Sequence, residues 1–337
     1  MRVLHVVFTK DFGGSERYAA GLATAQAEAG YDVRVLIRPQ GKVSPNIWDI
    51  IGQGVEVAEV SKFFQKWHIK QHIKYFEPDI IHTHLGKAAR LMGEMRPKCP
   101  TVATLHIDYK AKNYEKLDGL IAINPKQKKQ AKKEQYQGEI AEIQGYLGTF
   151  EGEKKAKKEQ KRTILGINSD IFIFGTLSRL HKGKGIADII AAFKQLKSAK
   201  MQLLVVGSGD EEENLKQLAK GDERIRFIPA VENPFPWYQM MDCFVSASHA
   251  EAFGLTLLEA MQAGCPIIAT ETVGAELALK DQPVQMVPIQ NVEKLKQAME
   301  GAFAEGMHRQ KYDLTAFSKE ACLRKIEDFY KKLCCSE

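Results

Sequence analysis

Two glutamates separated by seven residues frame a segment whose residue types suggest an anion-binding site. The segment runs from Glu251 to Met261, follows the strand-like run Cys243–Ser246 and continues as an apolar helical pattern through Glu259. Amides at the start of a helix have no intrahelical partner and attract anions, and a glycine there lets a ligand approach the backbone closely. The amides of Leu255 and Thr256 are therefore expected to hold the anion, with Gly254 allowing its close approach. A capped helix start with two surface carboxylates is the purely structural alternative.

A second segment supplies the positive charge that such an anion would need. Arg179 and Lys184 lie five residues apart in a glycine-containing loop, after the strand-like run Ile171–Gly175 and before the helical pattern Ile186–Lys197. Two cations that converge on a diphosphate can neutralise the charge that develops as a leaving group departs. A basic surface loop without a ligand is the alternative.

A glycine pair follows the first strand of the chain. Gly13 and Gly14 lie in the turn Asp11–Glu16, between the strand-like run Arg2–Phe8 and a helical pattern over Gly14–Glu28. Such a turn exposes backbone amides to phosphate, although glycine pairs are common in turns. The turn lacks the spacing G-x-G-x-x-G, which argues against a dinucleotide cofactor.

Histidines end two further strand-like runs. His106 follows Thr101–Leu105, and His82 and His84 follow the buried run that begins at Asp79. Two histidines at positions i and i+2 can share a metal ion, but the sequence near them offers no third ligand. The sequence therefore predicts no metal site.

Strand-like and helix-like segments alternate along the whole chain, which predicts an α/β fold with parallel, doubly wound sheets. The alternation breaks over the polar, lysine-rich stretch 145–161, which has the composition of a linker. Two Rossmann-like halves are therefore expected, with ligands bound in the crevice at the carboxyl ends of their strands. The first covers residues 1–150 together with about 318–337, and the second covers residues 151–317.

The composition is that of an ordinary globular protein. The chain has 337 residues, which suits two domains, with 44% hydrophobic and 27% charged residues. It contains no apolar run of about 18 residues, and its first residues predict a buried strand rather than a signal peptide. The six cysteines show no C-x-x-C pair, so reduced thiols are expected.

The net charge of +6 is unevenly distributed. Between Lys110 and Arg162 there are 14 Lys and Arg against 8 Asp and Glu, an excess equal to that of the whole chain. Solvated helix faces and a charged linker explain such a region, and attraction to an anionic membrane surface is the functional alternative. Nucleic acid is not expected, because aromatic residues are not interleaved with the lysines as in a base-stacking platform and no RRM, KH or zinc-finger pattern appears.

These motifs resemble those of glycosyltransferase family 4. The segment from Glu251 to Glu259 is similar to the family's E-x7-E motif, and the loop Thr176–Gly185 is similar to its G-R-L-x-x-x-K-G motif. Ser178 stands where the family usually has glycine, and Ala252 is a similar mild departure. The resemblance implies a GT-B fold of two Rossmann-like domains facing across a cleft, with a C-terminal helix that crosses back to the N-terminal domain.

The resemblance also implies roles for the motif residues. Arg179 and Lys184 would bind the donor diphosphate, Glu251 would contact hydroxyls of the donor sugar, and Glu259 would hydrogen-bond the ribose. His106 would position the donor sugar and stabilise the transition state, with Arg179, Lys184 and Glu251 completing the catalytic set. The remaining residues expected to bind the nucleotide sugar are Gly13, Gly14, Val231, Phe253, Gly254, Leu255 and Thr256. No metal or other cofactor is required, and the donor is a UDP-sugar by preference, with GDP- and ADP-sugars as alternatives.

The sequence thus predicts a retaining glycosyltransferase of the hexosyltransferase class. Its acceptor would be a glycan or glycolipid hydroxyl, in lipopolysaccharide or other cell-envelope glycan biosynthesis. The enzyme would be cytoplasmic, with peripheral attachment at the inner face of the cell membrane. Two alternatives stay open: a GT-B-like nucleotide-sugar epimerase, and a non-catalytic partner of another glycosyltransferase.

Overall fold

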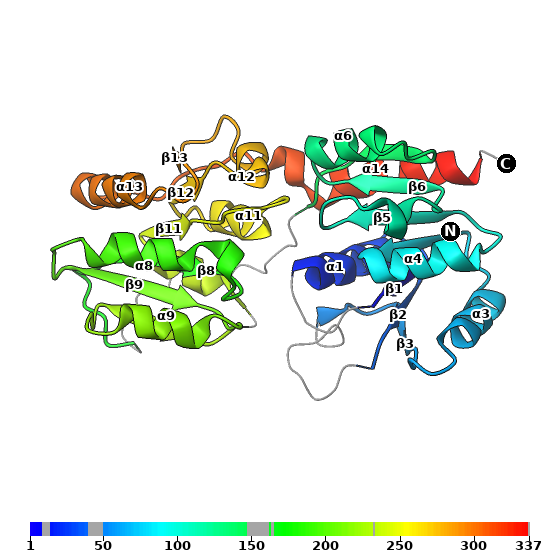
Figure 1. Ribbon diagram of the computed structural model, residues 1–337, viewed down its shortest axis with the longest axis horizontal. Coiled ribbons are helices and arrows are strands. Elements are labelled where there is room, and N and C mark those ends of the chain that lie inside the picture. The colour runs from blue at the N-terminus through cyan, green and yellow to red at the C-terminus, as the bar shows by residue number, and fades with distance from the viewer. Residues whose placement is uncertain (9–13, 40–49, 147–161, 163–164, 232, 336–337) are drawn as a thin grey trace. The chain divides into compact units, whose positions relative to one another are not determined.

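The computed structural model describes all residues except 9–13, 40–49, 147–161, 163–164, 232 and 336–337. It divides into two compact units (Figure 1). The N-terminal unit comprises Met1–Gly148 together with Phe317–Glu337, and the C-terminal unit comprises Thr149–Ala316. Each unit is built around its own parallel sheet.

The N-terminal unit contains a seven-stranded sheet in the order β3-β2-β1-β4-β5-β6-β7. The strands are β1 (Arg2–Val7), β2 (Asp32–Ile37), β3 (Val55–Glu59), β4 (Ile80–His84), β5 (Thr101–Leu105), β6 (Gly119–Ala122) and β7 (Glu139–Glu142). All neighbouring strands pair in parallel. The strand order reverses direction at β1, which is the doubly wound pattern of a Rossmann-like domain.

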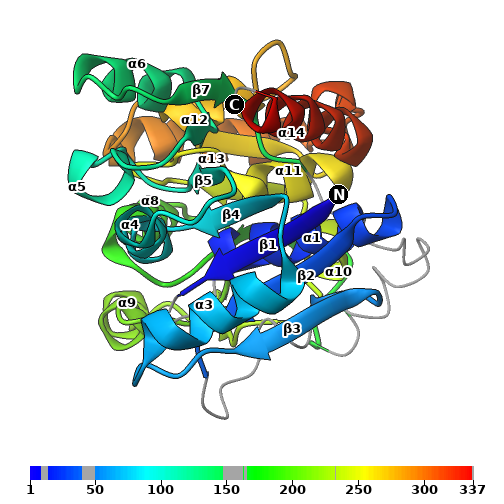
Figure 2. The same cartoon turned by 90° about the vertical axis from the view of Figure 1, so that its right-hand side faces the viewer.

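Helices cover both faces of this sheet (Figures 1 and 2). The hydrophobic core on one face includes α3 (Gln65–Phe76), α4 (Gly86–Met95), α5 (Ala111–Tyr114) and α6 (Pro125–Lys133). The other face is covered by α1 (Gly14–Glu28) and α14 (Lys319–Cys334), which contact each other. The buried face of α14 carries Ile326 and Tyr330 and packs with Leu22 of α1. The last helix of the chain therefore belongs to the N-terminal unit, which confirms the prediction that it crosses back.

The C-terminal unit contains a six-stranded parallel sheet in the order β10-β9-β8-β11-β12-β13. The strands are β8 (Phe172–Leu177), β9 (Met201–Val206), β10 (Ile225–Ile228), β11 (Cys243–Ser246), β12 (Ile267–Thr270) and β13 (Gln285–Val287). One core cluster joins the sheet to α8 (Ile186–Lys194), α9 (Glu212–Ala219) and α13 (Val292–Glu305). The helices α10 (Phe235–Met240), α11 (Leu255–Gln262) and α12 (Val273–Ala278) form a second contiguous layer.

The sequence patterns predicted the central strands of both sheets well but missed elements at their margins. The four-residue edge strand β7 has two exposed and two half-buried side chains, so it carries little apolar signal. The helix α6 was missed because it is lysine-rich and buries only Gln127 and Ala131. The helix α13 was also missed, although its buried stripe of Leu295, Ala298, Met299 and Ala302 has helical spacing. Among the described residues, no helix is both long and apolar enough to cross a membrane.

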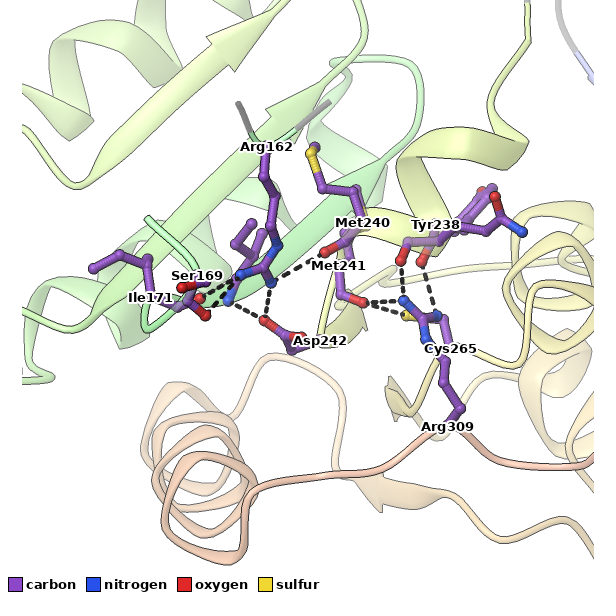
Figure 3. A network of polar contacts seen from close by, with 11 residues as sticks. Arg162, Ser169, Ile171, Tyr238, Met240, Met241, Asp242, Cys265 and Arg309 are labelled. Atoms are coloured by element: carbon purple, nitrogen blue, oxygen red, sulfur yellow. Dashed lines mark hydrogen bonds and ion pairs between the residues drawn. The ribbon is translucent and has the colours of Figure 1, made fainter. Parts of the chain in front are cut away.

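Two arginines connect the start and end of the C-terminal unit to its interior elements, the buried Arg162 and the exposed Arg309 (Figure 3). The Arg162 guanidinium pairs with Asp242 at 2.6 Å and also donates to the carbonyl of Ile171 at 3.0 Å. The same Asp242 carboxylate accepts the amide of Ile173 at 2.8 Å. Arg309 donates to the carbonyl of Tyr238 in α10 at 3.0 Å and to that of Met241, directly after the helix, at 2.7 Å. The cationic side chain stabilises the carbonyl end of that short helix.

The Arg162–Asp242 pair predicts a stability effect. We expect Arg162→Met to lower the free energy of unfolding by about 3 kcal/mol, because it leaves a partly buried carboxylate without its cation. Urea denaturation checks this, with Lys200→Met as the matched control. Lys200 forms an exposed pair with Asp170, so the control should change stability by at most about 0.5 kcal/mol. Equal effects of the two substitutions would contradict the prediction.

Candidate active site

Two loops of the C-terminal unit, one after β8 and one after β11, are held tightly against each other. Gly185 has φ +60°, and a Cβ built on it would lie 1.9 Å from the carbonyl oxygen of Ala247. His249 donates its backbone amide to the carbonyl of Gly183 at 2.9 Å, and its side chain Nε2 lies 2.7 Å from a carboxylate oxygen of Asp188. Only glycine permits this approach at position 185, so the two loops form one rigid surface.

This contact brings together two of the predicted site residues. The Lys184 Nζ lies 2.6 Å from a carboxylate oxygen of Glu251, and their side chains are 29% and 18% exposed. Lys184 comes from a 3-10 turn that precedes α8, and Glu251 from the loop between β11 and α11. Arg179 lies in the first of these loops and has an exposed side chain. The surface therefore carries both a cation and a carboxylate. The sequence predicted that Lys184 and Glu251 belong to one site, although they are 67 positions apart.

The helix α11 begins at the predicted glycine. Gly254 is its N-cap residue with φ 86°, and no side chain caps the helix there. Leu255 and Thr256 occupy its first turn and are half-buried, while Phe253 is buried. The carbonyl of Glu251 accepts the amide of Gly274 at 2.9 Å, so the start of α12 supports this loop from behind. The geometry is that expected for an anion site at a helix N-terminus.

Glu259 is buried in the interior of α11 rather than exposed on its surface. Its side chain is 5% exposed and accepts a hydrogen bond from the Tyr238 hydroxyl at 2.9 Å. Arg309 in turn binds the backbone carbonyl of Tyr238 and so supports the helix that carries this hydroxyl. A buried carboxylate requires such partners, and this excludes the simple reading of Glu259 as a surface residue.

The sequence did not identify Tyr238 or the loop after β9 as parts of this region. Leu180 donates its amide to the carbonyl of Ser208 at 2.8 Å and accepts the amide of Glu211 at 3.0 Å. The only signal for this loop was the glycine pair at 207 and 209 directly after a buried strand. For Tyr238 there was no signal, because the partner of a side chain depends on packing between α10 and α11.

The remaining predicted ligand residues are only partly described. Val231 is half-buried and follows β10, whereas its neighbour Glu232 lies outside the described residues. Gly14 is exposed and is the first residue of α1, whereas Gly13 lies outside the described residues. The predicted nucleotide contacts of these residues stay predictions.

The N-terminal unit buries a connected group of histidines on the face of its sheet that α1 and α14 cover. The His84 Nδ1 lies 3.1 Å from His106 Nε2, and His84 Nε2 lies 3.0 Å from His5 Nδ1. Gln26 of α1 accepts from His5 Nε2 at 2.7 Å. Tyr330 of α14 joins the group, with its hydroxyl 3.3 Å from Gln26 Nε2 and 2.5 Å from His82 Nδ1.

The structure corrects one expectation about these histidines. A third histidine, His5, lies with His82 and His84 so that ligand atoms of all three fall within 4.8 Å, which the sequence did not predict. Zinc–nitrogen bonds of about 2.1 Å require ligand separations of about 3.4 Å in a tetrahedral site. The 3.0 Å between His5 Nδ1 and His84 Nε2 is shorter than this and is a hydrogen-bond distance. The other ring nitrogens of the three histidines also have hydrogen-bond partners, so the side chains fit a hydrogen-bonded chain better than a metal site. His84 is fully buried.

Burial keeps these histidines neutral. Desolvation lowers the pKa of His5 to about 4, against an opposing effect of its bond to Gln26. Desolvation likewise lowers the pKa of the half-buried His106 to about 4. The pKa values of His82 and His84 are lowered well below the usual range by desolvation and by the neighbouring rings. At neutral pH each ring therefore carries one proton, and each can donate only once.

Two protein-family models match the chain. The model described as "Glycosyl transferases group 1" matches residues 171–305, and the model described as "Glycosyltransferase Family 4" matches residues 12–135. Among curated proteins, the lipopolysaccharide core biosynthesis glycosyltransferase LpsD of Rhizobium meliloti is 28% identical over 285 residues, covering 81% of this chain and 79% of its own length. LpsE of the same organism is 26% identical, and the alignment covers both chains completely.

Solved structures show the same fold. The Anabaena protein HepE, determined in complex with UDP and glucose, superposes with a TM-score of 0.84 at 17% identity, covering 98% of this chain and all of HepE. WaaG, described as a glycosyltransferase involved in lipopolysaccharide biosynthesis, gives a TM-score of 0.70 at 16% identity, covering 98% of this chain and 95% of WaaG.

The chain has two Rossmann-like units, and one of them carries a surface with a paired cation and carboxylate. Together these define a glycosyltransferase of the GT-B fold class. Both family models agree with the motifs that the sequence displays. The chain belongs to glycosyltransferase family 4, also called group 1.

The buried histidines predict acid sensitivity. Below their usual pKa of about 6.5 the unfolded chain binds more protons than the folded chain, so stability falls as the pH drops from about 6.5 towards 4. We expect His5 alone to remove about 2 kcal/mol of unfolding free energy between pH 7 and pH 5. Urea unfolding at the two pH values measures the loss. His5→Gln should reduce it, and the exposed His308→Gln should not; equal pH dependence in both variants would contradict the prediction.

Proposed function

We propose that this protein is a retaining glycosyltransferase that moves a hexose unit from a nucleotide diphosphate sugar to an acceptor hydroxyl. The observation that carries the proposal is the Lys184–Glu251 pair on the rigid surface formed by the loops after β8 and β11. A cation and a carboxylate beside the uncapped start of α11 suit a ligand with both phosphate oxygens and sugar hydroxyls.

The pair suggests how donor binding proceeds. In the protein alone, Glu251 balances the charge of Lys184. When a diphosphate binds, Lys184 can exchange the carboxylate for phosphate oxygens, and Glu251 then becomes available to accept from sugar hydroxyls. Together with Arg179, Lys184 stabilises the charge on the departing diphosphate, and no metal is needed for that step. His106 in the N-terminal unit is assigned to positioning the donor sugar.

The nucleotide end of the donor would be held by buried and backbone groups. Glu259, oriented by Tyr238, is assigned to the ribose, and the backbone around Val231 to the base. The amides of Phe253 to Thr256, with Gly13 and Gly14 of the N-terminal unit, are assigned to phosphates. UDP is the favoured nucleotide because the similar HepE was determined with UDP and with UDP-glucose.

The acceptor is proposed to be a growing cell-envelope glycan or glycolipid. LpsD and LpsE are named for lipopolysaccharide core biosynthesis, and both align over most of this chain. Such an acceptor would place the enzyme in the cytoplasm at the inner face of the membrane. The predicted attachment region Lys110–Arg162 is only partly described. Within it, Lys126 pairs with Asp108 at 3.3 Å and Lys128 with Glu142 at 3.6 Å.

A donor screen tests the proposal. UDP, GDP and ADP are compared by thermal shift, and the sugar nucleotides of the best binder are then assayed for hydrolysis and for transfer. The anomeric configuration of the product, read by proton NMR, decides between retention and inversion. Interconversion of the donor sugars without any acceptor would indicate an epimerase instead, and binding without turnover would indicate a non-catalytic partner.

The assignment of Lys184 gives a specific prediction. Lys184→Ala should reduce turnover by about 100-fold or more, because the leaving diphosphate loses a preorganised cation. The matched control is Lys182→Ala, since Lys182 is exposed in the same loop and has no assigned role. Steady-state kinetics with a saturating donor measures the effect. Near-normal turnover of Lys184→Ala, or an equal loss in Lys182→Ala, would remove the assignment.

A further inference from the structure

The start of α3 and the two residues before it present an unusual aromatic surface. The buried face of α3 packs Ile69 and Phe76 into the core of the N-terminal unit. Away from that core, Phe63 is 81% exposed, Phe64 80% and Trp67 60%. Large aromatic side chains are seldom this exposed to water, so three of them within five residues indicate an interaction surface. We call residues 61–76 the α3 surface.

The charge of the α3 surface indicates its partner. The segment contains four exposed lysines and no Asp or Glu; the lysines are Lys62, Lys66, Lys70 and Lys74. Of these, Lys66 pairs with Glu94 of α4 at 3.0 Å. A hollow beside the helix is lined by further cations, so that Lys70 and Lys74 lie with Arg96 and Lys98. The carboxylate in that hollow, Glu77, is paired with Arg2 at 3.1 Å.

Aromatic residues flanked by lysines are the composition of segments that lie in the interface of an anionic bilayer. We propose that the α3 surface docks this protein on an anionic lipid membrane, with Phe63, Phe64 and Trp67 entering the interface and the lysines contacting lipid phosphates. The described part of the predicted Lys110–Arg162 region fits less well. On its helix α6 the lysines are not accompanied by exposed aromatic side chains.

Vesicle flotation tests this proposal with the full-length chain. The protein should float with vesicles of phosphatidylcholine and phosphatidylglycerol, should stay behind with phosphatidylcholine alone, and should be released by salt. Phe63→Ser combined with Phe64→Ser and Trp67→Ser should lower the bound fraction at least about tenfold.

The matched control replaces lysines of α6, namely Lys128, Lys129, Lys132 and Lys133, with serine. Unchanged flotation of this control supports the α3 surface, and loss only in this control overturns it. Equal binding to neutral and anionic vesicles also overturns the proposal. So does the absence of flotation, if the protein instead forms a dimer in solution that the aromatic substitutions abolish.

A second inference concerns the histidine chain and rests on the proposed function of His106. The polarity of the chain is set by Gln26, because an amide oxygen only accepts and an amide nitrogen only donates. Its Oε1 faces His5 at 2.7 Å and its Nε2 faces the Tyr330 hydroxyl at 3.3 Å. His5 must therefore carry its proton on Nε2, which leaves His5 Nδ1 as an acceptor.

Each neutral ring passes this polarity to the next. His84 donates from Nε2 to His5 at 3.0 Å and so must accept at Nδ1. His106 then donates from Nε2 to His84 at 3.1 Å. We propose that Gln26 acts through His5 and His84 as a positioning residue, holding His106 as the Nε2–H tautomer whose Nδ1 accepts a hydrogen bond from a hydroxyl of the donor sugar.

The tautomer can be read directly by long-range proton–nitrogen NMR on histidine-labelled protein without any substrate. His106 should carry its proton on Nε2. Gln26→Met should populate the other tautomer, because His5 loses its acceptor, and Gln26→Glu should restore Nε2–H because a carboxylate also accepts. Thr104→Val is the control, since it removes only the partner of His82, 2.8 Å away on the other branch.

A proton on Nδ1 of His106 in the unmodified protein, or a tautomer that ignores Gln26→Met, overturns the inference. Turnover is read separately. Gln26→Met should lower kcat at least about tenfold with little change in the KM for the donor. If the tautomer follows Gln26 while turnover does not, the sugar contact at His106 is overturned, whereas absence of any transfer by the unmodified protein overturns the proposed function.

Discussion

Every strand of both sheets pairs in parallel, and the position of each candidate residue depends on that constraint. Parallel strands all end at the same edge, so loops that are remote in sequence become neighbours. In the C-terminal unit this brings the loop after β8 beside the loop after β11, because β8 and β11 are adjacent. In the N-terminal unit it aligns His5 with His82 on the paired strands β1 and β4. Both groups of polar side chains therefore follow from strand order and register.

The close contact at Gly185 holds the loops after β8 and β11 together as one defined surface. With the carbonyl of Ala247 against the Cα of Gly185, the two loops have little freedom to separate. Lys184 and Glu251 are consequently held at 2.6 Å before any ligand arrives. In the proposed function Lys184 exchanges Glu251 for the donor phosphates while the two loops keep their backbone contact, so the cation is already close to the developing charge.

In the N-terminal unit the main physical constraint is the burial of polar histidine side chains. Burying a polar ring without a partner costs more than leaving it in water, so the side chains of β1, β4 and β5 require partners from the covering helices. Gln26 of α1 and Tyr330 of α14 supply them. The last helix of the chain is thus connected to the sheet by a polar contact as well as by its apolar stripe. This chain links the interior of the unit to the half-buried His106 at the end of β5.

The sequence by itself determined the local structure and the family. Buried parallel strands are short apolar runs that read clearly, and the motifs around Arg179, Lys184, Glu251 and Glu259 have fixed spacings that identified glycosyltransferase family 4. Weakly apolar elements such as α6 and β7 were not predicted, because their stability comes from tertiary contacts rather than from the apolar pattern of their own sequence. Only the tertiary structure decided which side chains meet. The Tyr238–Glu259 bond, the Lys184–Glu251 pair and the bonds from His5 to Gln26 and His84 join residues between 21 and 79 positions apart. Such partners depend on how sheets and helices pack, and no local pattern of residues records that packing.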